Sequence, residues 1–375
     1  MRQVSTKAAI ITGAGGQDGY FLTRRLLGDG WTVHAIARQP SMSDFEDLPQ
    51  DSRARLHVHQ LDLLKPQSMC GLITQVQPDE FYNLAGQSSV SKSFSEPLYT
   101  WQTNAESVVH LLECIRKNSP HSHFYQASST DMFGTPANQG TTFNEDSALN
   151  PQSPYASAKA AAHLLCHSYR EVYGLRIASG ILSNHESHRR TTSFLSRKVI
   201  EHVRRLQRTA PDEVASSSPL VVGHLKVQRD WGFAPDYVEG MVKIMRQVKV
   251  RAEMGGEIQP DNGRSYRDYV LATGKTHAVW QLIDCAFTIA GFGLDWDFSG
   301  DHPAAWRGYL CGTTTVAVTV NPKLLRAAEP LVLRVDPGRA EQELGWAPQQ
   351  GLTVFLEDML KNAPRQVPVE GIATA

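Results

Sequence analysis

The chain of 375 residues carries almost no net charge. It has 37 Lys and Arg against 38 Asp and Glu, which gives a formal charge of −1. A near-neutral protein has no global field that would collect nucleic acid or an anionic membrane surface. We therefore expect neither as a partner. Any anionic ligand must be held by a local cluster of basic side chains.

Cysteines are few, and none of them forms a C-x-x-C pair. There are five, at scattered positions. Their odd number and spacing argue against a disulfide framework and against a structural zinc site, so we expect reduced thiols. His163 and His167 lie four residues apart without an evident third ligand, and the segment from His185 to His188 departs from H-E-x-x-H because position 189 is Arg. No metal site is expected.

Long apolar runs are also missing. No run approaches the roughly 18 residues that a membrane-spanning helix needs. Residues 1–7 are polar and lead directly into an apolar segment, so no secretory signal is recognisable. We expect a soluble cytoplasmic protein.

What the sequence does contain is an alternation of short apolar runs and amphipathic segments. Strands are predicted at Lys7–Thr12, Trp31–Ala37, Leu56–Gln60, Glu80–Ala85, His123–Ala127 and Arg176–Leu182. Helices are predicted at Tyr20–Leu27, Pro66–Val76, 103–117, Tyr155–Tyr173, Ser193–Arg208, Asp336–Leu344 and Leu352–Leu360.

This order predicts an α/β fold with a Rossmann-type, doubly wound parallel sheet. We place a nucleotide-binding domain at 1–182, with 229–250 packing back on it. A smaller mixed α/β substrate lobe follows at 183–365, and 366–375 has the composition of a tail.

Three glycines follow the first predicted strand. Gly13, Gly16 and Gly19 form G-x-x-G-x-x-G between a strand and a helix. Glycine is needed where the backbone approaches a pyrophosphate, and the helix N-terminus offers free N–H groups to it. The alternative is an ordinary tight turn. The position of these glycines, directly after the first predicted strand, favours a dinucleotide-binding site.

The second predicted strand ends at Arg38, where an NAD enzyme usually has an acid that binds the ribose hydroxyls. An Arg there can pair with a 2′-phosphate, which favours NADP over NAD. A solvated surface Arg is the competing interpretation. Asp62 and Leu63, after the third strand, are placed to contact the adenine.

Tyr155 and Lys159 lie four residues apart on a predicted helix and so share one face. A nearby ammonium favours the phenolate, which can then take a hydroxyl proton while hydride leaves the same carbon. Ser129 and Asp131, at the end of the fifth strand, are candidates to hydrogen-bond the reacting hydroxyl and to act as general base. Capping of a turn is the alternative role for Asp131.

Together these features resemble the GDP-mannose 4,6-dehydratase branch of the extended short-chain dehydrogenase/reductase family. The resemblance runs from about Lys7 to Leu360. It is carried by the blocks ITGAGGQDG, QPDEFYNLAGQSSV, FYQASSTDMFG, PQSPYASAKA, GILSNHESHRR, RDWGFAPDYV, YVLATG and DPGRAEQELGW.

The resemblance implies a role for each matching residue. The catalytic group would be Ser129, Asp131, Tyr155 and Lys159. The expected NADP site comprises Gly13, Gly16, Gln17, Asp18, Gly19, Arg38, Asp62, Leu63, Leu84, Ala85, Gln87, Tyr155, Lys159, Leu182, His185 and Arg190, with Arg189 beside the last. The expected GDP-sugar site comprises Ser88, Asn184, Lys198, Arg229, Arg326 and Glu329.

The implied reaction oxidises C4 of the sugar, eliminates water across C5 and C6, and returns hydride to C6. The implied assembly is a homodimer or homotetramer. The chain departs from the family at several positions: Asp131 replaces a Glu, Ser129 replaces a Thr, and the segment after Arg38 is shortened to QPSMSDFEDL. Gly223-His224 replaces a Gly-Asn, and the 209–219 loop is longer than usual.

Two other functions compete with the dehydratase. One is a nucleotide-sugar 4-epimerase or another 4-oxidising enzyme that has lost the elimination step. The carboxylate at position 131 argues for elimination. The other is a catalytically silent NADP-binding sensor, which the intact Tyr155 and Lys159 disfavour. The exact sugar, the pathway and the oligomeric state are left open by the sequence.

Overall fold

The computed structural model describes residues 7–40, 42–136, 138, 140–247, 265–325 and 330–362. The chain divides into two compact units, each assembled from three segments. Unit 1 comprises Met1–His185, Val227–His277 and Arg326–Gln349, and unit 2 comprises Glu186–Lys226, Ala278–Leu325 and Gln350–Ala375. The segments Val227–His277 and Arg326–Gln349, which lie within the lobe that we placed at 183–365, belong to unit 1.

Unit 1 is built on a seven-stranded sheet with the strand order β11-β7-β5-β4-β1-β2-β3. Every neighbouring pair is parallel. The strands are β1 (Ala8–Thr12), β2 (Thr32–Ala37), β3 (Leu56–Gln60), β4 (Glu80–Asn83), β5 (His123–Ser129), β7 (Ile177–Leu182) and β11 (Tyr269–Leu271). The predicted Rossmann-type parallel sheet is therefore confirmed.

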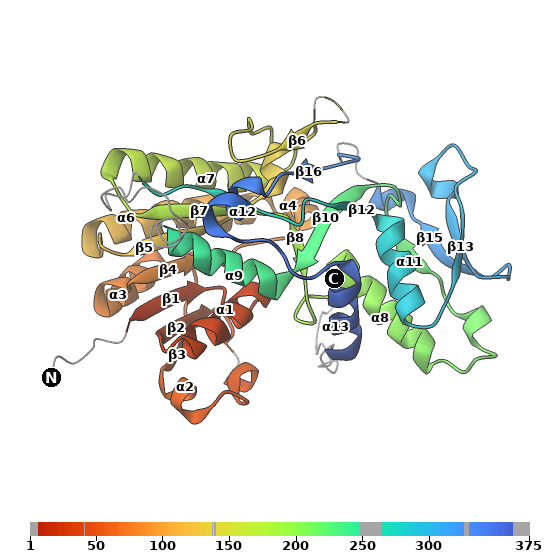
Figure 1. The fold of residues 1–375 in the computed structure, drawn as a ribbon, viewed down its shortest axis with the longest axis horizontal. Coiled ribbons are helices and arrows are strands. Elements are labelled where there is room, and N and C mark those ends of the chain that lie inside the picture. Colours follow the sequence, from red (N-terminus) through yellow and green to blue (C-terminus); the bar gives the residue numbers. More distant parts are fainter. Residues whose placement is uncertain are drawn as a thin grey trace. The chain divides into compact units, whose positions relative to one another are not determined.

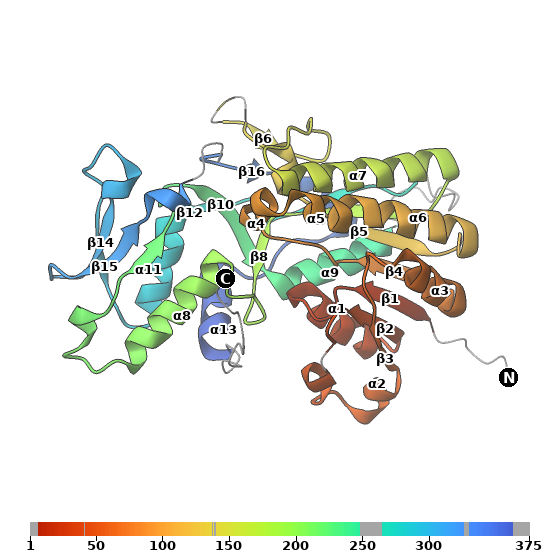
Figure 2. The ribbon, with the colours of Figure 1, turned by 180° about the vertical axis from the view of Figure 1, so that it is seen from behind.

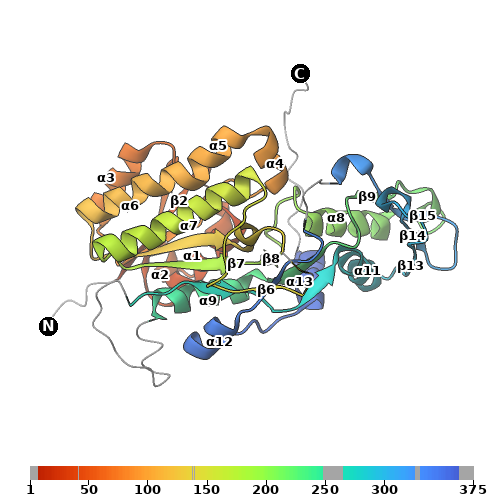
Figure 3. The ribbon, with the colours of Figure 1, turned by 90° about the horizontal axis from the view of Figure 1, so that it is seen from above.

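Helices cover both faces of this sheet (Figures 1 and 3). One face packs against α1 (Gln17–Gly28) and α9 (Ala234–Met245) in a core that includes Leu22 and Met241. The other packs against α3 (Pro66–Val76), α6 (Ser107–Asn118) and α7 (Pro154–Tyr173), with Ile73, Leu112 and Cys166 in its core. Burial on both faces explains the nearly continuous apolar runs of β1 and β7.

Shorter elements lie wholly or mostly in unit 1. They are α2 (Gln50–Ala54), α4 (Val90–Ser95), α5 (Pro97–Trp101), β6 (Thr142–Phe143), β8 (Asn184–Glu186), β10 (Gln228–Phe233), β12 (Thr276–Ala278), β16 (Arg334–Val335) and α12 (Gly338–Leu344). β12, β10 and β8 form a three-stranded sheet, and β16 pairs with β6. None of these strands was predicted, and neither was β11.

Unit 2 combines three helices with a four-stranded sheet (Figure 2). The helices α8 (Leu195–Arg208), α11 (Val279–Ile289) and α13 (Leu352–Asn362) pack on one another. The sheet has the order β13-β14-β15-β9, built from Leu294–Asp297, Arg307–Leu310, Val316–Val320 and Leu220–Val222. It is a mixed α/β unit, as predicted for the smaller lobe. No helix in the described ranges has the length and apolarity needed to cross a membrane.

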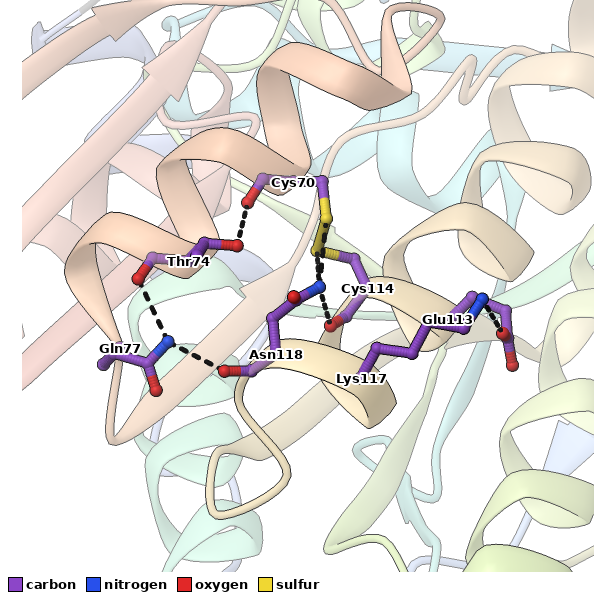
Figure 4. The surroundings of a disulfide bond; sticks show 7 residues. All are labelled: Cys70, Thr74, Gln77, Glu113, Cys114, Lys117 and Asn118. Atoms are coloured by element: carbon purple, nitrogen blue, oxygen red, sulfur yellow. Dashed lines mark hydrogen bonds and ion pairs between the residues drawn. A yellow bond between two sulfur atoms is a disulfide. The ribbon is translucent and has the colours of Figure 1, made fainter.

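One expectation from the sequence is wrong. Cys70 on α3 and Cys114 on α6 form a disulfide, while Cys166, Cys285 and Cys311 are free (Figure 4). The Asn118 amide donates to the carbonyl oxygen of Cys114 at 3.0 Å and lies 3.3 Å from the Cys70 sulfur. The two cysteines are 44 residues apart, and only the packing of α3 against α6 brings them together.

Candidate active site

The glycine turn joins β1 to α1 and is tightly packed. Gly13 has a φ of +73°, and a Cβ there would lie 2.9 Å from the backbone nitrogen of Ala85. A Cβ on Gly19 would lie 2.3 Å from the carbonyl oxygen of Gly13. Only glycine fits at either position, so the turn is held close to the segment that follows β4.

That segment is fixed by hydrogen bonds. Thr12 Oγ1 accepts from the backbone nitrogens of Leu84 and Ala85, both at 3.1 Å. The backbone nitrogen of Gln87 donates to Asn104 Oδ1 at 2.8 Å. The predicted residues Leu84, Ala85 and Gln87 therefore lie at the carboxyl ends of β1 and β4, as a nucleotide-binding site in a parallel sheet requires. Ser88 follows them and is exposed.

Gln17, Asp18 and His185 form one cluster at the start of α1. Gln17 Nε2 donates to the His185 carbonyl oxygen at 2.8 Å, and Asp18 Oδ2 lies 2.9 Å from His185 Nε2. The His185 ring stacks on Tyr237, with ring centroids 4.6 Å apart. The structure thus brings together three predicted cofactor residues that are 168 positions apart at most.

Arg38 and Asp62 lie at the ends of β2 and β3. Arg38 Nη1 donates to the Tyr99 hydroxyl at 2.6 Å. Asp62 Oδ1 accepts from the backbone nitrogen of Leu64 at 3.0 Å, while Leu63 is buried in the core. These positions follow the carboxyl ends of neighbouring strands, at the same edge of the sheet as the glycine turn.

Tyr155 and Lys159 lie on the first turns of α7. Ser153 caps this helix by accepting from the backbone nitrogen of Ala156 at 3.1 Å. Both side chains are buried, with exposed fractions of 8% and 7%. Lys159 Nζ is 6.0 Å from the centre of the Tyr155 ring and donates to the Ala127 carbonyl oxygen at 2.8 Å. Burial lowers the pKa of Lys159 to about 8, against the charge of Asp18, which raises it.

A pocket lies where β5 and β7 end. Ser129 closes β5, and its Oγ accepts from the backbone nitrogen of Asp131 at 3.3 Å. The pocket is lined by Thr130, Asp131, Ser183, Asn184, Arg229, Asp230, Leu333 and Val335, all of which belong to unit 1. Three predicted residues therefore share one pocket: Asp131, Asn184 and Arg229.

The remaining predicted residues lie elsewhere. Leu182 ends β7, while Arg190 and Lys198 belong to unit 2. Arg190 Nε lies 3.0 Å from Glu186 Oε2, and Lys198 Nζ donates to the Val221 carbonyl oxygen at 2.6 Å. Arg326 and Glu329 lie outside the described residues.

The sequence reasoning missed three polar residues of this pocket, Thr130, Ser183 and Asp230. Asp230 follows Arg229 directly in the RDWG block, so a signal was available. It was passed over because the strand that orients it, β10, was not predicted, and without a strand the side chain has no defined direction.

A parallel Rossmann sheet with a glycine turn, a Tyr-x-x-x-Lys pair on the helix after β5 and a carboxylate beside it defines the extended short-chain dehydrogenase/reductase class. The comparisons narrow this class. A family model described as GDP-mannose 4,6 dehydratase matches residues 10–359. The chain belongs to the GDP-mannose 4,6-dehydratase family.

Individual relatives agree with this assignment, and a solved structure agrees with the fold. The chain is 36% identical to GDP-mannose 4,6 dehydratase 2 of Arabidopsis thaliana, over 94% of this chain and 86% of that protein. It is 33% identical to GDP-mannose 4,6-dehydratase of Vibrio cholerae, over 95% and 93%. The fold matches that of RMD from Pseudomonas aeruginosa, solved with NADPH, with a TM-score of 0.69 at 22% identity and coverage of 95% and 97%.

Proposed function

We propose that the protein is a hydro-lyase that converts GDP-mannose, or a closely related GDP-sugar, to the GDP-4-keto-6-deoxy sugar with tightly bound NADP. The observation that carries this proposal is the carboxylate of Asp131 in the pocket at the end of β5, in the same unit as the Tyr155–Lys159 pair. Membership of the family supports the substrate class.

The residues of unit 1 fit a nicotinamide dinucleotide. The glycine turn packs closely on the segment after β4, since a Cβ at Gly13 or Gly19 would collide with backbone, and α1 begins directly after it, so its free N–H groups can bind a pyrophosphate. Arg38 at the end of β2 supports NADP rather than NAD, since a guanidinium can bind a 2′-phosphate. When bound, the oxidised nicotinamide would accept hydride from C4 of the sugar and return it to C6.

Residues of the chain itself accept and stabilise the protons that move in the reaction. Tyr155 takes the proton of the 4-hydroxyl as C4 becomes a ketone, and the buried ammonium of Lys159 stabilises the phenolate that does so. Ser129 is placed to hydrogen-bond the 4-oxygen. The Ala127 carbonyl oxygen fixes Lys159 Nζ in position, which is why this lysine acts as a point charge on the tyrosine rather than as a mobile side chain.

Asp131 then acts as the base at C5. The new ketone acidifies the C5 proton, which a carboxylate can remove as the 6-hydroxyl departs. Asp131 is one methylene shorter than the Glu of the family. We propose that this pocket is shaped for the shorter acid, since Thr130 and Leu333 line it alongside Asp131.

The test is incubation of the purified protein with GDP-mannose in D₂O, followed by NMR. A 4-keto-6-deoxy product with deuterium at C5 is the expected result. Asp131→Asn should lower turnover by at least about 10²-fold and leave NADP binding intact. A sugar inverted at C4 would instead identify an epimerase. NADP binding without turnover of any GDP-sugar would identify a sensor.

We also propose a homodimer or homotetramer. Supporting this, the large apolar side chains Phe94, Leu98, Trp101 and Leu164 are 48–79% exposed on α4, α5 and α7, which pack side by side. Exposed apolar groups on one layer are typical of an interface.

The cytoplasm is our proposed location, and the three free thiols fit a reducing compartment. A disulfide between Cys70 and Cys114 is not expected in a reducing compartment. The number of free thiols in protein taken directly from cells therefore tests the proposed location.

A further inference from the structure

Arg190 lies in a short loop between the end of β8 and the start of α8, and its side chain is held on two sides. Its Nε lies 3.0 Å from Glu186 Oε2, and its Cζ lies 3.5 Å from the centre of the Phe194 ring. All three residues belong to unit 2, and the arginine side chain is 18% exposed. One edge and one face of the guanidinium are therefore fixed before any ligand binds.

The two terminal nitrogens of Arg190, Nη1 and Nη2, form the open edge of this group. Neither has a hydrogen-bond partner among the residues that the structure describes, and neither is fully enclosed, whereas Nε is enclosed. A guanidinium presents its N–H groups in a planar fork that matches two oxygens of a phosphate. The open edge of Arg190 is therefore suited to an oxyanion.

Glu186 is itself buried and held in place. It is 3% exposed, and its Oε2 accepts from Ser196 Oγ at 2.5 Å. Ser196 lies in the first turn of α8, and Phe194 is the residue before this helix. The start of α8 therefore supplies both the ring that covers Arg190 and the hydroxyl that fixes its carboxylate partner. A buried carboxylate needs partners of this kind.

The ion pair between Glu186 and Arg190 works against the attraction of an anion. The carboxylate offsets the charge of the guanidinium and repels a phosphate, so for attraction alone it is unfavourable. It is favourable if it holds the guanidinium in one orientation, because less side-chain entropy is then lost when the anion binds. The arrangement therefore indicates that orientation matters at this arginine.

We propose that Glu186 is a positioning residue, which together with Phe194 holds Nη1 and Nη2 of Arg190 ready for a phosphate group of a bound nucleotide. The inference rests on the proposed function, which supplies two nucleotides with such groups, NADP and the GDP-sugar. A chain with a net charge of −1 has no general attraction for them, so a local device of this kind is needed. Glu186 acts through the arginine and makes no contact with the ligand.

Glu186→Gln separates orientation from charge by the sign of its effect. The variant removes a negative charge beside the guanidinium, so attraction alone predicts tighter phosphate binding. We expect binding that is weaker by about 10-fold. Two measurements distinguish the nucleotides: the rate at which the holoenzyme releases NADPH into excess NADP⁺, followed by NADPH fluorescence, and the affinity for GDP, measured by calorimetry. The nucleotide whose binding weakens is the one that Arg190 holds.

A double-mutant cycle shows whether Glu186 acts through Arg190. Arg190→Lys and Arg190→Met should both weaken binding of the same nucleotide by at least about 10-fold, since neither side chain offers a fork. In the Arg190→Met background, Glu186→Gln should cause no further loss, whereas a purely structural role would add to it. Glu201→Gln is the matched control, because this acid pairs with Arg197 in the same unit and should leave both measurements unchanged.

The inference and the proposed function fail in different ways. Tighter or unchanged binding of both nucleotides by Glu186→Gln would overturn the positioning role, and unchanged binding by Arg190→Met would overturn the phosphate site itself. If Glu186→Gln does not fold, Phe194→Leu tests the same proposal by removing the ring, and it should weaken binding of the same nucleotide. A wild type that binds neither nucleotide would overturn the proposed function as well. Neither measurement requires turnover.

Discussion

At the scale of single residues, the site depends on charges that are buried in unit 1. Lys159 is the clearest case. Its ammonium is almost fully enclosed, it has a carbonyl oxygen as hydrogen-bond partner, and its pKa is lowered to about 8 by burial. Such a lysine destabilises the fold while it is charged. Its positive charge also favours the phenolate form of the neighbouring Tyr155.

The destabilisation by the buried Lys159 ammonium predicts how the free energy of unfolding depends on pH. In the unfolded chain Lys159 keeps its proton up to about pH 10.4, whereas in the fold it loses it above about 8. Between these values the unfolded state binds more protons, so the free energy of unfolding should rise with pH. Urea denaturation at pH 7, 8.5 and 10 measures this contribution.

The matched variants are Lys159→Met, which should be more stable at pH 7 and lose this part of the pH dependence, and Lys117→Met on the exposed face of α6. The Lys117 variant should keep the wild-type slope. If the free energy of unfolding rises equally for Lys159→Met and the wild type from pH 8 to 10, the buried ammonium does not destabilise the fold as we infer.

The sequence predicted the residues that carry strong local patterns. Gly13, Tyr155, Lys159 and Asp131 were found because each follows a recognisable strand or shares a helix face. Asp230 was missed, since its place in the pocket depends on which side chains surround it and a sequence does not state that. Arg190 and Lys198 were assigned through the family resemblance alone, and in unit 2 they bind Glu186 and the Val221 carbonyl oxygen.

At the scale of elements, the disulfide between α3 and α6 stabilises one face of the sheet. Both helices are crossovers between strands of the sheet: α3 leads from β3, at one edge, to β4, and α6 leads from β4 to the neighbouring β5. Cys70 lies on the second turn of α3, and the helix itself begins four residues after Asp62, where we expect the adenine. The cross-link therefore limits the motion of a helix that starts beside the proposed cofactor site.

Removal of this cross-link should destabilise the fold. Closing a loop of 44 residues corresponds to about 4 kcal/mol of unfolded-state entropy in the chain-entropy model, and measured values are commonly lower. Cys70→Ser/Cys114→Ser should therefore lose about 2–4 kcal/mol in urea denaturation. Reduction should have the same effect on the wild type and none on the double variant.

Thiol titration provides the control for that prediction. The denatured wild type should show three reactive thiols before reduction and five afterwards, because Cys166, Cys285 and Cys311 are free. Cys285→Ser should keep the wild-type stability response to reduction. Five thiols in unreduced protein would show that the helices pack without the cross-link.

At the scale of the whole molecule, the order of strands and helices predicted the parallel sheet but not its completion. Six of the seven strands of the Rossmann sheet were found within a few residues, and the predictions Leu56–Gln60 and Pro66–Val76 agree with the structure. The seventh strand, β11, is three residues long and pairs with β7 from a distant part of the chain. Local patterns cannot report such a pairing, since it depends on tertiary contacts.

The whole molecule also has an apolar layer that unit 1 leaves exposed. Leu98 and Trp101 on α5 are 79% and 48% exposed, and Leu164 on the neighbouring α7 is 55% exposed. Side chains of this size are usually covered, and a stable interface buries about 800 Å² on each partner. A second copy of the chain is the occupant that we propose. The wild type should then have a solution mass that is a multiple of 41.5 kDa.

Leu98→Glu/Trp101→Glu should shift that mass to 41.5 kDa in sedimentation equilibrium or light scattering, because a charge buried without a partner at an interface costs several kcal/mol. Leu331→Glu is the matched control: this leucine is 54% exposed but lies outside the layer of α4, α5 and α7. It should leave the wild-type mass unchanged. A monomeric wild type, or a double variant that associates as strongly as the wild type, would remove α5 from the interface. The exposed layer would then have to be covered by a partner other than this chain.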